Sequence, residues 1–263
     1  MKIDAILTPA ELPTLAKRDL RETLCVVFDV LRATSTFVTA LHNGAKAIIP
    51  VGEISEVLAI RKKQPDVLLG GERDGVKIRA AQTGGTDFDL GNSPRECAPE
   101  KVRGKTIVST TTNGTRALRA CAGAKTVLAG SFLNLGATAE FIKKLQPAEV
   151  LLVCAGTREN RADEDVLAAG VLCELLEAGS SRCDDRTAQR AVPAKQSDSA
   201  EIARLAWTQA KSDLAAAVHN ATNARRLLAI PELRDDVAFC LQRDVFPLVA
   251  RMDADGAIRR QPA

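Results

Sequence analysis

The chain is poor in aromatic and imidazole side chains. Its 263 residues include no tyrosine, one tryptophan and an aromatic content of 3%. Such a sequence offers little surface for base stacking, so we expect no nucleic-acid partner. Histidine, a common acid–base catalyst, occurs only at His42 and His219. An enzyme with this composition has to rely mainly on carboxylates, arginines and hydroxyls, with or without a metal ion.

Signals for membranes, secretion and disulfides are also missing. No apolar run approaches about 18 residues, and residues 1–4 lack the basic-then-apolar pattern of a signal peptide. The seven cysteines form no Cys-x-x-Cys pair, and the net charge is only +3. We therefore expect a cytoplasmic protein with no membrane partner, zinc site or disulfide framework.

Familiar phosphate-binding motifs are absent as well. Pro99 stands where a Walker loop ending at residues 104–106 needs glycine, and no Gly-x-Gly-x-x-Gly follows a strand. Leu31 occupies the position of the second aspartate of dehalogenase-type phosphatases. Cys154 is followed by arginines that do not have the spacing of a cysteine-phosphatase loop. The common phosphate-handling classes are therefore not supported.

The most informative segment present is the hydroxyl-rich turn at residues 109–115. It follows an apolar run at 106–108 and precedes a helix-like run at 116–120. Backbone amides at the start of a helix point outward and attract anions. The pattern predicts a strand, an anion-binding turn and a helix.

A similar layout occurs earlier, where residues 26–28 precede the turn at 29–36. Matching Gly-Ala-Lys triplets follow at 44–46 and 123–125. We interpret residues 25–73 and 106–158 as two copies of a β-α-β-α-β unit. The alternative is that any two α/β segments look alike at this level. The pattern predicts a single domain over 1–263, a three-layer α/β/α fold with a mainly parallel or mixed sheet.

Other segments extend this outline. Residues 73–103 form a long polar insert, and 163–177 are predicted to form an amphipathic helix. Residues 180–199 are expected to be a polar linker or loop. The C-terminal part, about 200–245, is mostly helical in pattern, and 246–250 resemble a terminal strand.

Ligands of open α/β sheets bind beyond the carboxyl ends of the strands. If the strands are parallel, the turns after them bring acids, arginines, an amide and a hydroxyl to one crevice: Asp29, Arg32, Glu72, Arg73, Asn113 and Thr115. Asp29 is equally a candidate helix cap, and Arg32 a candidate surface salt bridge. The acids at 164–165 either complement a helix dipole or hold a hard cation such as Mg²⁺.

Six motifs occur in order along the chain: residues 29–36, 71–73, 88–94, 111–115, 154–156 and 164–165. Together they resemble the 2-phosphosulfolactate phosphatase family over nearly the whole sequence. The resemblance implies a Mg²⁺-dependent phosphatase with an α/β fold of its own. Its namesake reaction converts 2-phospho-3-sulfolactate and water to 3-sulfolactate and phosphate in coenzyme M biosynthesis. An extra polar stretch at 78–86 departs from the family pattern and bears on the substrate.

The resemblance assigns roles to residues of this chain. The predicted catalytic residues are Asp29, Arg32, Glu72 and Arg73. The predicted metal ligands are Asp29, Glu72, Glu164 and Asp165. The predicted substrate-binding residues are Ala33, Thr34, Ser35, Asn92, Ser93, Thr111, Thr112, Asn113, Gly114, Thr115, Cys154 and Gly156.

Three questions stay open at the level of sequence. Water attacks the phosphorus directly, which we favour, or Asp29 forms an aspartyl-phosphate. The small-molecule substrate is 2-phospho-3-sulfolactate or another phosphorylated hydroxy-acid or sugar. A non-catalytic anion-binding protein is the alternative from a different class. The composition is compatible with a homodimer.

Overall fold

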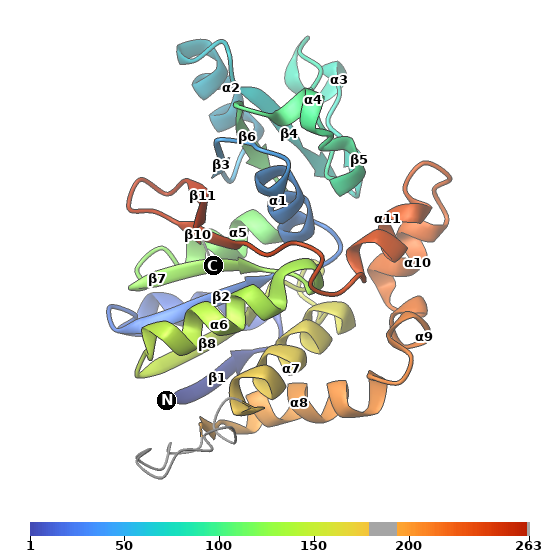
Figure 1. Ribbon diagram of the computed structural model, residues 1–263. Helices are drawn as coiled ribbons and strands as arrows, with labels where there is room; N and C mark the ends of the chain where they lie inside the picture. Colours follow the sequence, from blue (N-terminus) through green and yellow to red (C-terminus); the bar gives the residue numbers. More distant parts are fainter. Residues whose placement is uncertain (179–193, 262–263) are drawn as a thin grey trace.

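The computed structural model describes residues 1–178 and 194–261 (Figure 1). They form one sheet with the strand order β5-β4-β6-β3-β11-β10-β7-β2-β8-β1-β9. Its strands are β1 Lys2–Ile6, β2 Thr23–Phe28, β3 Ala47–Pro50, β4 Leu68–Arg73, β5 Val76–Lys77, β6 Thr106–Thr110, β7 Thr126–Gly130, β8 Glu149–Cys154, β9 Lys195–Gln196, β10 Val249–Met252 and β11 Ile258–Gln261.

Helices connect and cover these strands, which confirms the predicted α/β/α class. The α-helices are α1 Ala33–His42, α2 Ile54–Lys63, α3 Ala80–Thr83, α4 Pro99–Val102, α5 Gly114–Ala120, α6 Leu135–Leu145, α7 Asp163–Ala178, α8 Asp198–Ala210, α9 Leu214–His219, α10 Thr222–Leu228 and α11 Arg234–Cys240. The 3₁₀ helices are η1 Pro9–Lys17, η2 Pro94–Glu96 and η3 Phe132–Asn134.

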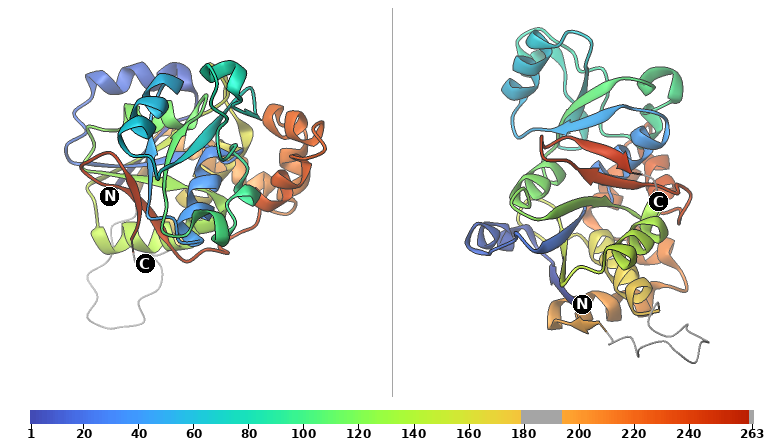
Figure 2. Two further views of the ribbon diagram at one scale, coloured as in Figure 1. Left: turned by 90° about the horizontal axis from the view of Figure 1, so that it is seen from above. Right: turned by 60° about the vertical axis from the view of Figure 1, so that its left-hand side comes forward.

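The sheet is mixed because a hairpin separates two parallel blocks. Strands β4, β6 and β3 form one block, and β7, β2, β8 and β1 form the other. The hairpin β10–β11 pairs antiparallel with both, through Ala250 against Ala129 and Ile258 against Ile48. Figure 2 shows it in red between the blocks. The predicted terminal strand is therefore half of a hairpin at the centre of the sheet.

The two proposed repeats exchange their first strands. β2 lies between β7 and β8 of the second unit, whereas β6 lies between β3 and β4 of the first. The connections through α1 and α5 therefore cross from one block to the other. This arrangement is what two interlocked copies would form, but the duplication itself stays a prediction.

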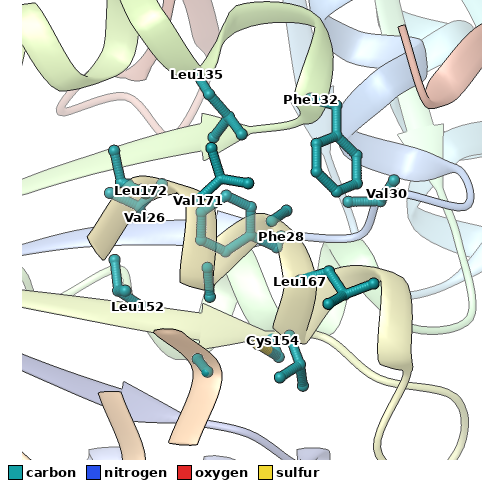
Figure 3. Close-up of a cluster of buried hydrophobic side chains, with 14 of the residues drawn as sticks. Val26, Phe28, Val30, Phe132, Leu135, Leu152, Cys154, Leu167, Val171 and Leu172 are labelled. Carbon is teal, nitrogen blue, oxygen red and sulfur yellow. The ribbon is translucent and has the colours of Figure 1, made fainter. Parts of the chain in front are cut away.

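The core lies on both faces of the central strands. Val26 and Phe28 of β2 pack with Leu152 of β8 against Leu167 and Val171 of α7 (Figure 3). Alternate residues of the same strands face the other side, with η1, α1 and α5: Cys25, Val27, Leu151 and Val153. A strand buried on both faces needs a continuous apolar run, as β2 and β8 have.

The turn between β2 and α1 meets the turn between β6 and α5; we call these two turns the elbows. A Cβ added at Gly114 would lie 2.6 Å from Ala33 Cβ and 2.7 Å from Asp29 Oδ2. Residues other than glycine carry that atom, so the elbows can approach this closely only with glycine at position 114. The sequence predicted that these turns share a cleft, and in the structure they touch.

The remaining segments agree with the sequence in outline. The insert at 73–103 contains β5, α3, η2 and α4, and the predicted C-terminal helical part consists of α8 to α11. The predicted linker at 180–199 lies largely outside the described residues. Within residues 1–178 and 194–261, no helix combines the length and apolar character needed to span a membrane.

Substituting Gly114 tests the contact between the elbows. We expect Gly114→Ala to lower the free energy of unfolding by about 1–3 kcal/mol, because the new methyl group has no room. Urea unfolding measures this change. Gly123→Ala is the matched control, since a Cβ there meets no atom within 4 Å. Equal effects of the two substitutions would show that the close approach carries no strain.

Candidate functional site

Asp29 is the first residue after β2 and is held by the start of α1. Its carboxylate oxygen Oδ1 accepts a hydrogen bond of 3.0 Å from the backbone N–H of Ala33. The Thr34 hydroxyl donates to the carbonyl oxygen of Asp29 at 2.9 Å. Burial raises the pKa of Asp29 to about 6, and the charge of Glu72 adds to the increase, while the Ala33 amide opposes it. Asp29 therefore binds the first amide of α1 and is also an acid inside the site.

Arg32 forms a buried ion pair, which excludes the surface salt bridge considered above. Its Nη1 donates to Asp236 Oδ2 of α11 at 2.7 Å, and its Nη2 to the carbonyl oxygen of Gly75 at 2.6 Å. The other oxygen of Asp236 accepts from the Ser93 hydroxyl at 2.7 Å. The side chains of Arg32 and Asp236 are 2% and 0% exposed. The guanidinium is thus fixed by two segments far apart in the sequence.

Glu72 ties the end of β4 to the second elbow. Its Oε1 accepts from the Thr112 amide at 2.8 Å and its Oε2 from the Gly75 amide at 2.7 Å. Arg73 points away from it, because neighbouring residues of a strand face opposite sides. Its Nη2 donates to the Thr110 hydroxyl at 3.1 Å. The structure therefore brings Glu72 to the site and directs Arg73 to the other side of β4.

Glu164 and Asp165 begin α7 and are both buried. Asp165 accepts from the amide of Val30 at 2.8 Å and from the amide of Gly156 at 3.0 Å, one bond to each oxygen. Glu164 Oε1 accepts from Asn223 Nδ2 at 2.7 Å. Asp165 thus fastens two loops together, and Glu164 reaches toward α10.

These acids lie close enough to influence one another. Burial raises the pKa of Glu164 to about 7, and the charge of Asp29 contributes. Burial also raises the pKa of Asp165 well above its usual value, followed by the charges of Glu164 and Asp29. Mutual repulsion of like charges in a poorly hydrated site favours their protonated forms, and a cation would favour the ionised forms.

The predicted substrate-binding hydroxyls mostly bond within their own loops. Ser35 donates to the carbonyl oxygen of Val30 at 2.8 Å, and Thr115 donates to that of Thr111 at 2.9 Å. Ser93 donates to Asp236, as described above. Because these hydroxyl hydrogens are occupied, their main effect in the structure is to shape the loops around the site.

The other predicted binding residues divide between the site and its support. Asn92 offers its backbone oxygen to the Thr36 hydroxyl at 2.8 Å, and Asn113 Oδ1 accepts from the Arg158 amide at 3.0 Å. Cys154 faces the apolar core beside Phe28 (Figure 3), so its side chain does not face the site.

Four residues around the site were not predicted from the sequence. Asn223 and Asp236 hold Glu164 and Arg32 from the C-terminal helices. Gly75 donates to Glu72 and lies next to Arg226. Asp236 follows the six motifs by many positions, in a short predicted helix within residues 235–244, a stretch that also resembles the family. Its partner Arg32 is distant in sequence, so local patterns do not reveal the pair.

The acids of the site offer few donor atoms to a metal ion. No group of three Asp, Glu, His or Cys side chains in residues 1–178 and 194–261 is suited to hold a metal. Glu72 and Asp165 already accept backbone amides at both oxygens. Mg²⁺ usually binds one or two carboxylates and takes its other ligands from water and substrate phosphate. Asp29 accepts the Ala33 amide at Oδ1, and Glu164 accepts Asn223 Nδ2 at Oε1, which makes these two the acids to consider as ligands.

Comparisons with known proteins agree with the motifs. The family model described as 2-phosphosulpholactate phosphatase matches residues 7–255. The protein named probable 2-phosphosulfolactate phosphatase of Caldanaerobacter subterraneus subsp. tengcongensis is 38% identical over 244 residues, 92% of each chain. The protein of the same name from Clostridium acetobutylicum is 33% identical over 250 residues, covering 95% of this chain and 96% of its own.

A third relative with the same name, from Thermotoga maritima, is 38% identical over 224 residues. That alignment covers 85% of this chain and 86% of the relative. The match of the family model includes both elbows and the acids in the first turn of α7. The chain therefore belongs to the 2-phosphosulfolactate phosphatase family.

Proposed function

We propose that this chain is a Mg²⁺-dependent phosphatase that hydrolyses 2-phospho-3-sulfolactate to 3-sulfolactate and phosphate. The observation that carries the proposal is the convergence of Asp29, Glu72, Glu164 and Asp165 where the two elbows meet. Asp29, Glu164 and Asp165 have raised pKa values because they are buried, so ionising all three is costly in the absence of a cation. Family membership supports phosphatase chemistry, and the names of the relatives support 2-phospho-3-sulfolactate as the substrate.

Asp29 and Glu164 are the residues that we propose to hold the metal ion. The bound ion would supply Lewis-acid polarisation of the phosphoryl group and neutralise its charge. Glu72 and Asp165 keep the surrounding loops in position through backbone amides. Arg32, paired with Asp236, holds the Gly75 carbonyl in place beside the site. Phosphoryl transfer depends chiefly on such positioning and electrostatics.

We favour direct attack of water. A water oxygen forms a bond to phosphorus, and the bond from phosphorus to the C2 oxygen breaks. The leaving oxygen gains the proton that the attacking water loses. Residue 31 is a buried leucine, so the acid that assists an aspartyl nucleophile in dehalogenase-type phosphatases is missing. On this mechanism, substituting Asp29 would affect metal binding rather than a covalent step.

Rapid-quench experiments with phosphate-labelled substrate distinguish the two mechanisms. We expect no labelled enzyme at any time before steady state, because water rather than Asp29 receives the phosphoryl group. Labelled wild-type protein, together with unlabelled Asp29→Asn, would establish the aspartyl-phosphate instead.

Metal removal tests the cofactor and the reaction together. With Mg²⁺ we expect phosphate release from 2-phospho-3-sulfolactate, loss of release after EDTA treatment, and recovery when Mg²⁺ is added in excess. A panel containing other phosphorylated hydroxy-acids and sugar phosphates identifies the preferred substrate. Binding of these anions without release from any of them would favour the non-catalytic anion-binding protein.

Neighbouring acids at the start of α7 provide a matched test of the site. Glu164→Gln should reduce kcat/KM by about 100-fold or more, because a site carboxylate is lost while the side-chain shape is kept. Asp163→Asn changes an exposed acid and should stay within about twofold. Steady-state kinetics with Tm as the folding control measures both. Similar activities of the two variants would remove Glu164 from the site.

A further inference from the structure

Arg226 of α10 has an unusual environment for an arginine in this chain. Its Nε is buried without a hydrogen-bond partner. Its Nη2 makes one long bond of 3.4 Å, to Asn223 Oδ1. The side chain as a whole is half-buried, and within residues 1–178 and 194–261 it forms no ion pair. A buried N–H of a charged group without an acceptor is unfavourable, and a bound anion would supply the acceptor.

The guanidinium lies against the same residue that contacts Arg32. A Cβ added at Gly75 would lie 3.4 Å from Arg226 Nε and 3.6 Å from its Cζ. The amide of Gly75 donates to Glu72, and its carbonyl accepts from Arg32. Arg226 is therefore a neighbour of the candidate site, although it comes from a helix that carries none of the sequence motifs.

The two arginines beside Gly75 differ in their charge balance. Arg32 is paired with Asp236 at 2.7 Å, so its charge is compensated inside the protein. Arg226 has no such carboxylate among the described residues. Opposite charges that are already paired add little to anion binding, whereas an uncompensated guanidinium presents a planar set of donors suited to an oxyanion.

We propose that Arg226 binds one of the two acidic groups that the substrate carries besides its phosphate, the carboxylate or the sulfonate, and thereby determines specificity. The inference rests on the proposed function, in which the phosphate is bound near Asp29 and Glu164. It adds the contact by which the enzyme distinguishes a phosphorylated acid from a neutral phosphomonoester.

A supporting role of Arg226 makes a different prediction. Through Asn223, Arg226 is connected to Glu164, whose Oε1 accepts from the same amide group. If Arg226 acted only through that connection, its removal would slow hydrolysis of every phosphomonoester equally. A specificity residue instead affects only substrates that carry the second acidic group.

The test compares 2-phospho-3-sulfolactate with glycerol 2-phosphate, which carries its phosphate at the same carbon but has neither the carboxylate nor the sulfonate. We expect Arg226→Ala to lower kcat/KM for the first by about tenfold or more and for the second by less than about twofold. Arg226→Lys should retain part of the preference. The matched control Arg225→Ala removes the same charge from an exposed neighbour and should change neither.

A third ester, 2-phospholactate, separates the two acidic groups. It keeps the carboxylate and lacks the sulfonate, so a loss of tenfold or more in Arg226→Ala assigns the carboxylate, and no loss assigns the sulfonate. Equal losses on all three esters, or no loss on any, would overturn the inference.

Direct binding keeps this inference separate from the proposed reaction. If the wild-type protein hydrolyses none of the esters, the proposed function fails, and titration calorimetry with 3-sulfolactate becomes the test. Binding that is at least about tenfold weaker in Arg226→Ala than in Arg225→Ala supports an acid-binding role. Equal affinities, or no binding to the wild-type protein, contradict it. If glycerol 2-phosphate alone is not hydrolysed, inhibition replaces hydrolysis in the comparison. Inhibition by 3-sulfolactate should then weaken in Arg226→Ala, whereas inhibition by inorganic phosphate should not.

Discussion

The rest of the structure depends on the burial of four acidic side chains, those of Asp29, Glu72, Glu164 and Asp165. Isolated carboxylates are costly to bury, and here backbone amides from neighbouring loops reduce that cost. Asp165 accepts the amides of Val30 and Gly156, and Glu72 accepts those of Thr112 and Gly75. Each of these two acids thereby holds loops from different parts of the chain in a fixed relation.

The strand order of the sheet brings these loops together. The strands β2 and β6 each lie in the block formed mainly by the other half, so their elbows meet near the middle of the molecule. The hairpin β10–β11 fills the sheet between the blocks and pairs with both. The glycine at position 114 then allows contact with Ala33 and Asp29. Close contact between the elbows brings together acids that a single unit would not contain.

The helices after α7 complete the site from the opposite end of the chain. Asn223 binds Glu164, and Asp236 compensates the charge of Arg32. Arg226, in contrast, keeps its charge uncompensated within the described residues. Arg32 is thus a fixed cation that stabilises the fold around the site, whereas Arg226 is the cation that we propose to bind an oxyanion. Recognition of a second acidic group would then depend on a helix outside the two repeats.

The sequence by itself determined the fold class, the helix at α7 and the two elbows, because apolar periodicity and turn residues act over a few neighbouring positions. It also identified Asp29 and Glu164 as acids in suitable turns. Only the tertiary structure decided that Arg73 points away, that Cys154 belongs to the core, and that Asp236 pairs with Arg32. Such relations depend on strand order and on packing between distant segments, which local sequence patterns do not encode.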